Sequence, residues 1–191
     1  MSVYDQIADQ VVDNIEQLNV SDSSVKKKKK MAGNCSIVID RVTPHNIHQV
    51  KVLNQAILPL SYNDKFYYEV RESGEFAKLA YFNDVSVGAI CCRIDESRDK
   101  KSLYIMTFGV LPAYRKCGIG SKLLEHAFHL VDDDKSIKTI SLHVQVDNKV
   151  AINFYTKYGF KQQGLVADFY QLLPSIDMNE QAYLLVKDVR Y

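Results

Sequence analysis

The sequence of 191 residues has no apolar run that approaches the ~20 residues of a membrane-spanning helix. It also has no excess of either charge, since the formal net charge is +1 and the sequence pI is near 7.6. The chain therefore lacks an electrostatic field that would by itself recruit nucleic acid or an acidic membrane. Asp5 and Asp9 stand where a signal or transit peptide would be basic or free of acid, so we expect a cytoplasmic protein, with the nucleus as the alternative compartment.

Cysteines and metal-ligating residues are also scarce. The four cysteines lack the C-x-x-C spacing of zinc and redox sites, which predicts free thiols in a reducing compartment. His126 and His129 lie three residues apart on a predicted helix, but no cysteine or carboxylate cluster accompanies them to complete a zinc site. We therefore predict no bound metal.

The apolar fraction of 47% is enough for one buried core, and we predict one domain over residues 35–191 after an N-terminal extension over residues 1–34. Residues 1–25 of the extension contain five acidic residues and no lysine or arginine. Such an acidic amphipathic helix is marginal alone in water, so it needs a groove, either on this domain or on a partner. Apolar residues recur in it at helical spacing, at Val3, Ile7, Val11, Ile15 and Leu18.

Five consecutive lysines, residues 26–30, follow a segment rich in serine and aspartate. We interpret them as a solvated charged tether, and a patch for nuclear import or for binding a polyanion is the alternative. Met31 comes directly after the lysines and offers a second translation start. A mass measurement on the endogenous protein would distinguish the two starts.

Helical and strand-like patterns alternate along the predicted domain. The predicted strands cover residues 36–42, 77–83, 85–94, 103–110 and 139–146, a stretch from Phe160, and a stretch within 182–188. The predicted helices cover residues 44–56 with Thr43 as N-cap, 64–73, the stretch from the glycine loop to Val131, and 149–158 with Gly159 as its stop. This order predicts an α/β or α+β fold with a mixed sheet flanked by helices.

The most informative stretch, between a strand and a helix, is VLPAYRKCGIGS at residues 110–121. Gly118 and Gly120 lack Cβ atoms where the helix begins, so the unbonded N–H groups of its first turn can face an anion. Arg115 and Lys116 add cationic donors beside them. The spacing is neither that of a Walker A loop nor that of a dinucleotide-binding loop, and we interpret it as a site for a pyrophosphate.

Two polar ring-bearing residues, Tyr104 and His143, stand on strand faces that the aliphatic side chains avoid. They share one face if the two strands are neighbours. A histidine, or a Tyr–His pair that holds a water, can take the proton from an amine before that amine attacks an acyl group. The alternatives are a structural histidine and a strand tyrosine that packs on its neighbours.

Residues 110–121 match the acetyl-CoA loop of the GNAT N-acetyltransferases, V-x-P-x-Y-R-x-x-G-I-G, at every fixed position. From about residue 36 to 170 the chain resembles the N-alpha-acetyltransferase 50 type of that superfamily, also called San or the NatE catalytic subunit. The resemblance implies the GNAT fold and direct transfer of acetyl from acetyl-CoA to protein N-termini, typically Met followed by a hydrophobic or other non-small residue. It is carried by VTPHNI (42–47), SYNDKFY (61–67), AKLAYFND (77–84), CCR (91–93), LYIMT (103–107) and LHVQ (142–145).

The same resemblance implies roles for individual residues and partners. Tyr104 and His143 would act through an ordered water as the general base, and Tyr155 would donate a proton to the leaving thiolate. The catalytic and auxiliary subunits of the NatA complex, and the ribosome, are the implied partners. The implied acetyl-CoA contacts are Phe108, Gly109, Val110, Arg115, Lys116, Cys117, Gly118, Ile119, Gly120, Ser121, Asn148, Ala151, Tyr155 and Lys157. The implied substrate contacts are Leu58, Pro59, Leu60, Tyr62, Arg93, Met106, Phe169 and Tyr170.

Two departures from the family pattern affect the peptide pocket. Leu58 stands where the family has Phe, and Phe169 replaces a Tyr, so one stacking wall and one hydroxyl donor are missing. A lost hydrogen bond of ~0.5–1.5 kcal/mol would weaken peptide affinity about threefold to tenfold without abolishing turnover. These two positions should therefore affect the choice of peptide more than they affect catalysis.

Two other functions and one other mechanism compete with direct acetyl transfer to an N-terminus. The acceptor could be a lysine side chain, whereas Pro59 and Tyr62 argue against a small amine. Cys117 could carry the acyl group covalently, but it lies in the phosphate loop, away from Tyr104 and His143. The chain could also be a non-catalytic acetyl-CoA-binding subunit that docks on an N-terminal acetyltransferase complex or on the sister chromatid cohesion machinery.

Overall fold

The computed structural model describes residues 35–58, 60–96, 100–167, 169 and 181–189. Within them the chain forms a seven-stranded mixed sheet with the order β1-β2-β3-β4-β5-β7-β6. The strands are β1 (Ile37–Arg41), β2 (Ala77–Phe82), β3 (Val85–Asp95), β4 (Ser102–Val110), β5 (Thr139–Gln145), β6 (Lys161–Val166) and β7 (Ala182–Asp188). The α-helices are α2 (Ile47–Ile57), α3 (Asp64–Glu72), α4 (Ile119–Asp133) and α5 (Lys149–Lys157), and the 3₁₀-helices are η1 (Gly74–Phe76) and η2 (Pro112–Tyr114). The predicted mixed sheet flanked by helices is confirmed, whereas the predicted acidic helix, lysine run and second start lie outside the described residues.

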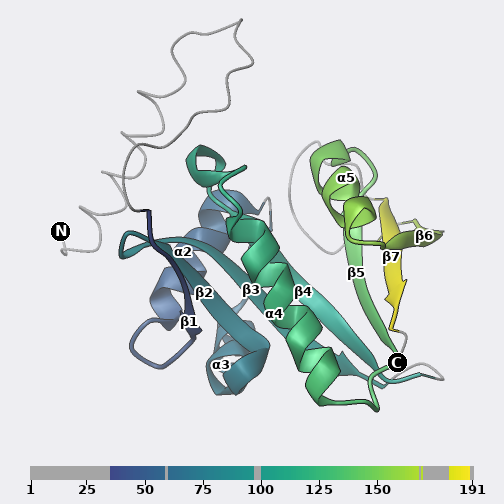
Figure 1. Cartoon of the computed structure of the whole chain (residues 1–191), viewed down its shortest axis with the longest axis horizontal. Helices are drawn as coiled ribbons and strands as arrows, with labels where there is room; N and C mark the ends of the chain where they lie inside the picture. Colours follow the sequence, from purple (N-terminus) through teal and green to yellow (C-terminus); the bar gives the residue numbers. More distant parts are fainter. Residues whose placement is uncertain (1–34, 59, 97–99, 168, 170–180, 190–191) are drawn as a thin grey trace, which may run out of the picture.

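The helices form a layer on each face of the sheet, and α4 runs diagonally across one of the two faces (Figure 1). Successive residues of β4 point to opposite faces, which separates the two layers. Phe108 contacts Phe154 and Tyr155 of α5, and a Cβ on Gly120 of α4 would also meet its ring. A Cβ on the next β4 residue, Gly109, would instead meet Ile57 of α2. Helices α4 and α5 therefore cover one face, and α2 covers the other.

Helix α4 is held against the sheet by an apolar stripe that is buried along its whole length. Apart from one adjacent pair, its members follow one another at intervals of three or four residues, which keeps them on one side of a helix. Full burial of each large aliphatic side chain stabilises the fold by ~1.5–3 kcal/mol relative to exposure. The buried residues of α4 are Ile119, Leu123, Leu124, Ala127 and Val131.

The first helix begins later than the sequence predicts. Thr43 was predicted as the N-cap and residue 44 as the first helical residue, but α2 begins at Ile47. The reason is the Asn46 side chain, which accepts a hydrogen bond from the Thr43 amide at 2.6 Å and donates one to the Arg41 carbonyl at 2.9 Å. These two bonds close a turn over residues 43–46 before the helix starts.

The predicted start of a helix at residue 64 and the predicted stop at Gly159 are confirmed, because a single residue determines each of them. Asn63 caps α3 by accepting a hydrogen bond from the Phe66 amide at 3.0 Å. Asn83 and Asp84 both adopt positive φ values, 46° and 66°, as a tight hairpin turn between β2 and β3 requires. Gly159 ends α5 with a φ of 85°.

The sheet parts between β4 and β5. These strands pair in parallel at three positions only, Ser102 with Thr139, Leu103 with Ile140, and Tyr104 with Ser141. Beyond these positions the two strands diverge (Figure 1). Opposite β3, strand β4 also holds an extra residue, Met106, because Cys91 pairs with Thr107 while Cys92 pairs with Ile105. The parting and the bulge open the sheet at the C-terminal ends of two parallel strands.

All four cysteines lie in the described part of the chain and are free thiols. Cys91 and Cys92 are buried side by side in β3, where burial raises the pKa of the Cys91 thiol to about 11. Neither is available as a nucleophile. The helices of the described residues are too short or too polar to span a bilayer.

Candidate active site

A cavity of about 120 Å³ occupies the place where β4 and β5 part. Its walls come from the connection between α2 and α3, from residues 105–108 of β4, from residues 142–145 of β5, and from α5 with its N-cap. Segments far apart in the sequence therefore meet at one opening in the sheet. The cavity brings together these predicted site residues: Leu58, Leu60, Tyr62, Met106, Phe108, His143, Asn148, Ala151 and Tyr155.

Tyr104 and His143 form a hydrogen-bonded pair beside this cavity. The distance from the Tyr104 hydroxyl oxygen to His143 Nδ1 is 2.9 Å. The pairing register explains the contact, because Tyr104 lies opposite Ser141 and His143 is two residues further along β5 on the same face. Both side chains are half-buried. Strands β4 and β5 are thus neighbours, which is the condition for Tyr104 and His143 to share one face of the sheet.

Two further predicted residues surround the pair. The Phe169 ring stacks on the His143 ring with a centroid distance of 4.1 Å and an interplanar angle of 18°. The Arg93 guanidinium carbon lies 5.3 Å from the centre of the Tyr104 ring, because Arg93 pairs with Tyr104 across β3 and β4. The pair therefore has an aromatic cover on one ring and a cation on the other.

Tyr155 is 4% exposed and packs against the rings of Phe108 and Phe160. Burial raises the pKa of its phenol, and the nearby Cys92 thiol raises it further. The hydroxyl of Tyr155 therefore stays protonated and can only donate a hydrogen bond toward a developing anion in the cavity. Asn148 holds the start of α5 in place, since its side chain accepts a hydrogen bond from the Ala151 amide at 3.0 Å.

The glycine loop leads into the N-terminus of α4 as the sequence predicts. Gly118 is the N-cap residue with a φ of 87°, and Lys116 also has a positive φ, 66°. Arg115 Nε donates a hydrogen bond to the Val110 carbonyl at 3.0 Å, which fixes the side chain and leaves its terminal nitrogens for an anion. Val110 and Ile119 are buried, so they can offer only backbone groups to a ligand.

The remaining predicted residues lie at the edges of this arrangement. Cys117 lies in the loop before α4, where its thiol donates a weak hydrogen bond to the Arg115 carbonyl at 3.7 Å. Lys157 is exposed at the last position of α5, which places it ~12 Å along the helix from Lys149. Pro59 and Tyr170 lie outside the described residues.

Some cavity residues were not predicted from the sequence. Gln145 is the one that the sequence could have indicated most easily, because it follows His143 by two residues on a strand and therefore shares its face. The others are aliphatic or small strand residues whose pattern does not distinguish a cavity wall from core. The unpredicted residues are Ile105, Thr107, Leu142, Val144 and Gln145.

Comparisons with known proteins agree with this geometry. A model of the acetyltransferase (GNAT) family matches residues 47–160. The chain is 50% identical over 154 residues to N-alpha-acetyltransferase 50 of Danio rerio, covering 81% of this chain and 89% of that protein. It is 47% identical over 155 residues to the probable N-acetyltransferase san of Drosophila melanogaster, covering 81% and 82%. The solved structure of Arabidopsis thaliana Naa50 in complex with the bisubstrate analogue CoA-Ac-MVNAL superposes with a TM-score of 0.72 at 41% identity, covering 81% of this chain and 99% of that one.

Proposed function

The chain belongs to the acetyltransferase (GNAT) family, within the N-alpha-acetyltransferase 50 group, and from this premise we propose how its residues carry acetyl from acetyl-CoA to the α-amino group of a protein. The observation that supports the proposal best is the 2.9 Å hydrogen bond between Tyr104 and His143 at the opening between β4 and β5. The pair places a phenol and an imidazole where a single water molecule could reach them. That combination suits removal of a proton from an incoming amine.

The pair acts as a general base. An α-amino group has a pKa of ~7.7–8.0 and is mostly protonated at pH 7, so it must lose a proton before it attacks. With the Tyr104 hydroxyl donating to His143 Nδ1, its oxygen still has lone pairs for a water that touches the ammonium. The proton passes through the water to the Tyr104 oxygen while the hydroxyl proton moves to His143. The neutral nitrogen then attacks the thioester carbon, the C–S bond breaks, and the proton that the new amide nitrogen loses ends on the departing thiolate, which leaves as the CoA thiol.

Residues on the α4 and α5 side of the sheet hold the acetyl donor. The amides at the start of α4 and the Arg115 guanidinium suit its pyrophosphate. Tyr155 lies at the cavity wall and donates a hydrogen bond to the departing sulfur. Because burial raises its pKa, complete proton transfer to a thiolate is uphill, and Tyr155 stabilises the thiolate mainly by that hydrogen bond.

The substrate N-terminus enters from the α2 side. Leu58, Leu60 and Met106 give this side of the cavity an apolar lining, which suits a methionine side chain. The bisubstrate analogue bound to the Arabidopsis relative has the peptide sequence MVNAL. We therefore propose that this chain prefers N-termini that begin with Met followed by a hydrophobic or other non-small residue.

A peptide panel tests this preference. The panel contains Met-Leu, Met-Lys, Ser and acidic N-termini together with an N-blocked peptide that contains lysine. We expect turnover to be highest on the Met-starting peptides. The variants Leu58→Phe and Phe169→Tyr restore the two family residues, and each should lower the peptide KM about threefold to tenfold if it adds one contact or hydrogen bond.

Two results of the panel would contradict the proposal. Turnover on the blocked lysine peptide alone would make the chain a lysine N-epsilon-acetyltransferase. Binding of acetyl-CoA without turnover on any peptide would favour a non-catalytic subunit. The wild-type protein with acetyl-CoA but no peptide controls for hydrolysis of the thioester.

Replacing Arg115 with alanine should raise the KM for acetyl-CoA about 10- to 150-fold, because a charged hydrogen bond to phosphate contributes ~1.5–3 kcal/mol. Turnover at saturating acetyl-CoA should change little. Arg115→Gln is the matched control, since glutamine keeps an N–H donor for the Val110 carbonyl but loses the charge. An unchanged KM for acetyl-CoA in both variants, measured by steady-state kinetics, would show that Arg115 does not bind the pyrophosphate.

We also propose a compartment and partners. Four free thiols suit a reducing compartment, so we place the protein in the cytoplasm, with the nucleus as a second location. The resemblance of the sequence supports assembly with the catalytic and auxiliary subunits of the NatA complex at the ribosome. Co-purification of tagged protein with ribosomes and NatA subunits tests this assembly.

A further inference from the structure

Polar side chains on β4 and β5 form cross-strand pairs where the two strands run side by side. Ser102 and Ser141 form the first pair, with 2.9 Å between their hydroxyl oxygens. Tyr104 and His143 form the second pair, with 2.9 Å between the hydroxyl oxygen and Nδ1. In both pairs the β5 residue follows the β4 residue by 39 positions. This constant offset shows which residues would form the next pair.

The next cross-strand pair falls on Thr107 and Gln145. On β5, Gln145 follows His143 by two residues. On β4, the bulge inserts Met106, which moves the equivalent position to Thr107. The strands have parted at this level, and both residues line the active-site cavity that lies between the strands. Thr107 and Gln145 are therefore separated by the space that the substrates would enter.

Thr107 lies on the same face of the sheet as Tyr104. Their partners on β3, Cys91 and Arg93, are two residues apart, and such residues share a face. A Cβ on Gly109, two residues further along β4, would meet helix α2. Thr107 therefore faces the side of the sheet that α2 covers, from which the peptide is proposed to enter.

The Thr107 hydroxyl is buried and forms no hydrogen bond with any of the described residues. Thr107 is 3% exposed. Its neighbour Cys91 has a neutral thiol, because burial raises the pKa of that thiol to about 11 although the Thr107 hydroxyl lowers it. A neutral thiol is a weak hydrogen-bond partner. Because an unpaired buried hydroxyl is unfavourable, a ligand that supplies the missing partner is bound more tightly.

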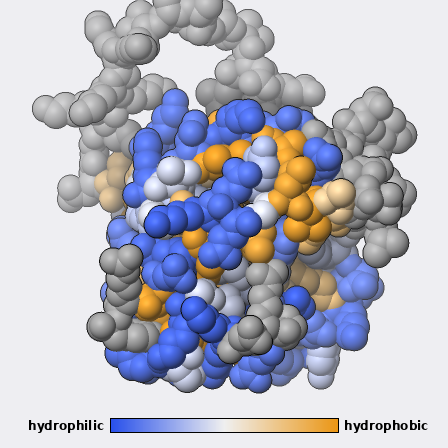
Figure 2. Space-filling view, turned by 90° about the vertical axis from the view of Figure 1, so that its right-hand side faces the viewer, coloured by the Kyte–Doolittle hydropathy of each residue, from blue (hydrophilic) through white to orange (hydrophobic). Residues whose placement is uncertain are grey.

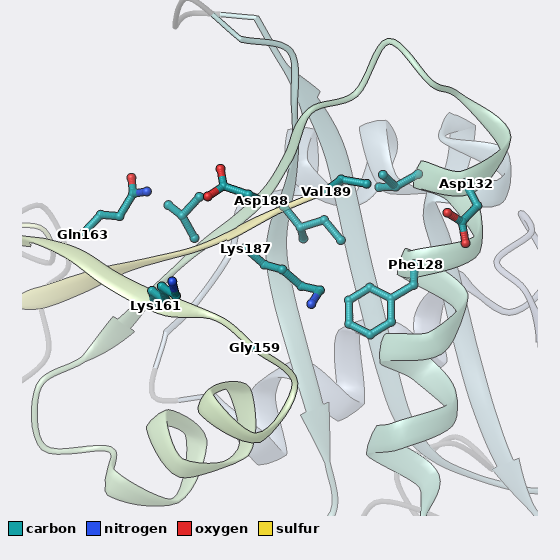
Figure 3. A pocket seen from close by; sticks show the side chains of 11 residues that line it. Phe128, Asp132, Gly159, Lys161, Gln163, Lys187, Asp188 and Val189 are labelled. Carbon is teal, nitrogen blue, oxygen red and sulfur yellow. The ribbon is translucent and has the colours of Figure 1, made fainter. Parts of the chain in front are cut away.

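This unpaired hydroxyl distinguishes the active site from a second cavity, of about 420 Å³, between α4, β6 and β7 (Figure 3). The two cavities share no lining residue. One other buried side-chain polar atom of the described residues lacks a hydrogen bond, Asn54 Nδ2, and its residue lines neither cavity. On the side of the domain that carries α5, β6 and β7, hydrophobic surface appears in patches among hydrophilic side chains (Figure 2). Of the two cavities, the active-site cavity is therefore the one that a polar group of a ligand would complete.

We propose, on the basis of the proposed acetyl transfer, that Thr107 is a further substrate-binding residue. Its hydroxyl oxygen accepts a hydrogen bond from the α-amino group of the incoming peptide. An amine that has lost one proton still carries two N–H groups, and a buried N–H group without an acceptor is unfavourable. Much of the cavity lining is aliphatic, whereas Thr107 offers a hydroxyl oxygen on the face that holds the Tyr104–His143 pair.

The spacing of Tyr104 and Thr107 suits an amine that binds between them. Successive residues on one face of a strand are ~7 Å apart. A path from the Tyr104 oxygen through a water and the amine nitrogen to the Thr107 oxygen has three hydrogen bonds, which span about 9 Å when extended. A bent path therefore covers the distance. An amine held in this way keeps its lone pair free for the thioester carbon.

Two substitutions at Thr107 test the proposal. Thr107→Val replaces the hydroxyl with a methyl group and should lower kcat/KM for a Met-Leu peptide at least tenfold, because a hydrogen bond to a charged group is worth a factor of about 10–150. Thr107→Ser keeps the hydroxyl and should stay within about threefold of wild type. The matched control is Thr139→Val, which makes the same replacement on β5 outside the cavity lining and should leave kcat/KM unchanged.

Peptide affinity identifies the group that Thr107 contacts. Calorimetry in the presence of CoA compares the Met-Leu peptide with the same peptide carrying hydrogen in place of its α-amino group. The preference for the peptide with the amine should fall at least tenfold in Thr107→Val. The affinity for the peptide without the amine should equal that of wild type, which also shows that the variant is folded.

Two outcomes would overturn the proposal. Unchanged kcat/KM in Thr107→Val would show that the hydroxyl does not contact the substrate. An equal loss of affinity for both peptides would make Thr107 part of the pocket wall and not the partner of the amine. Failure of the proposed function has a different signature, the absence of turnover on every N-terminal peptide, and the affinities in the presence of CoA need no acetyl transfer.

Discussion

Replacing His143 with alanine should lower kcat for N-terminal acetylation by about 10²–10⁴-fold, which is the usual contribution of a positioned general base. In the proposed mechanism the imidazole takes the Tyr104 hydroxyl proton as the amine proton reaches the Tyr104 oxygen, and its Nδ1 lies 2.9 Å from that hydroxyl. Tyr104→Phe removes only that hydroxyl and should produce a loss of similar size. Single-turnover acetylation of a Met-Leu peptide measures both losses, while calorimetry should give unchanged acetyl-CoA affinity.

The pH profile separates a base from a structural histidine. Without His143 the amine loses its proton to bulk water, so kcat/KM should rise with pH until the amine titrates at ~7.7–8.0. The wild-type profile should reach its plateau at lower pH, because the pair takes the proton within the complex. Equal losses at every pH would indicate a positioning role only, and undiminished turnover in both variants would exclude the pair as the base.

Ser141→Ala is the matched control for these variants. Ser141 lies two residues before His143 on β5, and its hydroxyl oxygen is 2.9 Å from that of Ser102 on β4. The substitution therefore perturbs the same two strands without touching a titratable group. We expect it to cost about 1 kcal/mol of folding stability while kcat stays within twofold of wild type.

Gly109→Ala should destabilise the fold by about 1–3 kcal/mol through overpacking. A Cβ at this position would lie 2.5 Å from Ile57 Cγ2, and a β-branched side chain cannot easily turn away. For a chain of this size the loss lowers the melting temperature by roughly 2–4 °C per kcal/mol. Since Ile57 ends α2 just before the residues proposed to contact the peptide, the peptide KM should also rise.

A double-mutant cycle checks the cause. Ile57→Ala removes the clashing methyl group, so the pair G109A/I57A should be less destabilised than the sum of the single variants, by about 1 kcal/mol. Gly120→Ala is the stability control, because a Cβ there would lie 3.5 Å from the Phe108 ring, an ordinary contact. An unchanged melting temperature in Gly109→Ala would show that α2 shifts at no cost.

Features that depend on neighbouring residues could be predicted from the sequence. The Asn83–Asp84 turn, the Asn63 cap and the Gly159 stop each follow from the preferences of one or two side chains. The start of α2 could not, because Asn46 as well as Thr43 can form side-chain hydrogen bonds with nearby backbone groups, and only the fold shows which turn forms. Local chemistry thus fixes where most elements begin and end.

The active site required information about distant residues. The alternation of β4 and β5 puts Tyr104 and His143 on polar faces, but nothing in either strand shows that they run in parallel as neighbours. That pairing is a property of the whole sheet, and the family resemblance supplied it in advance. Stacking of Phe169 on His143 is equally non-local. A cavity of about 420 Å³ between α4, β6 and β7 was not predicted, because its walls come from separate elements that carry no common motif.

The short pairing between β4 and β5 has a mechanical consequence. The sheet is continuous in order, yet strands β1 to β4 and strands β5 to β7 are joined through three paired positions only. We therefore expect the two halves to behave as separate cooperative units, which loosen from each other at a lower free energy than global unfolding requires. A molecule bound in the opening contacts both halves, so it holds the strands apart there and also stabilises the association of the two halves. The acetyl donor in that opening would thus stabilise the folded enzyme as well as serve as its cosubstrate.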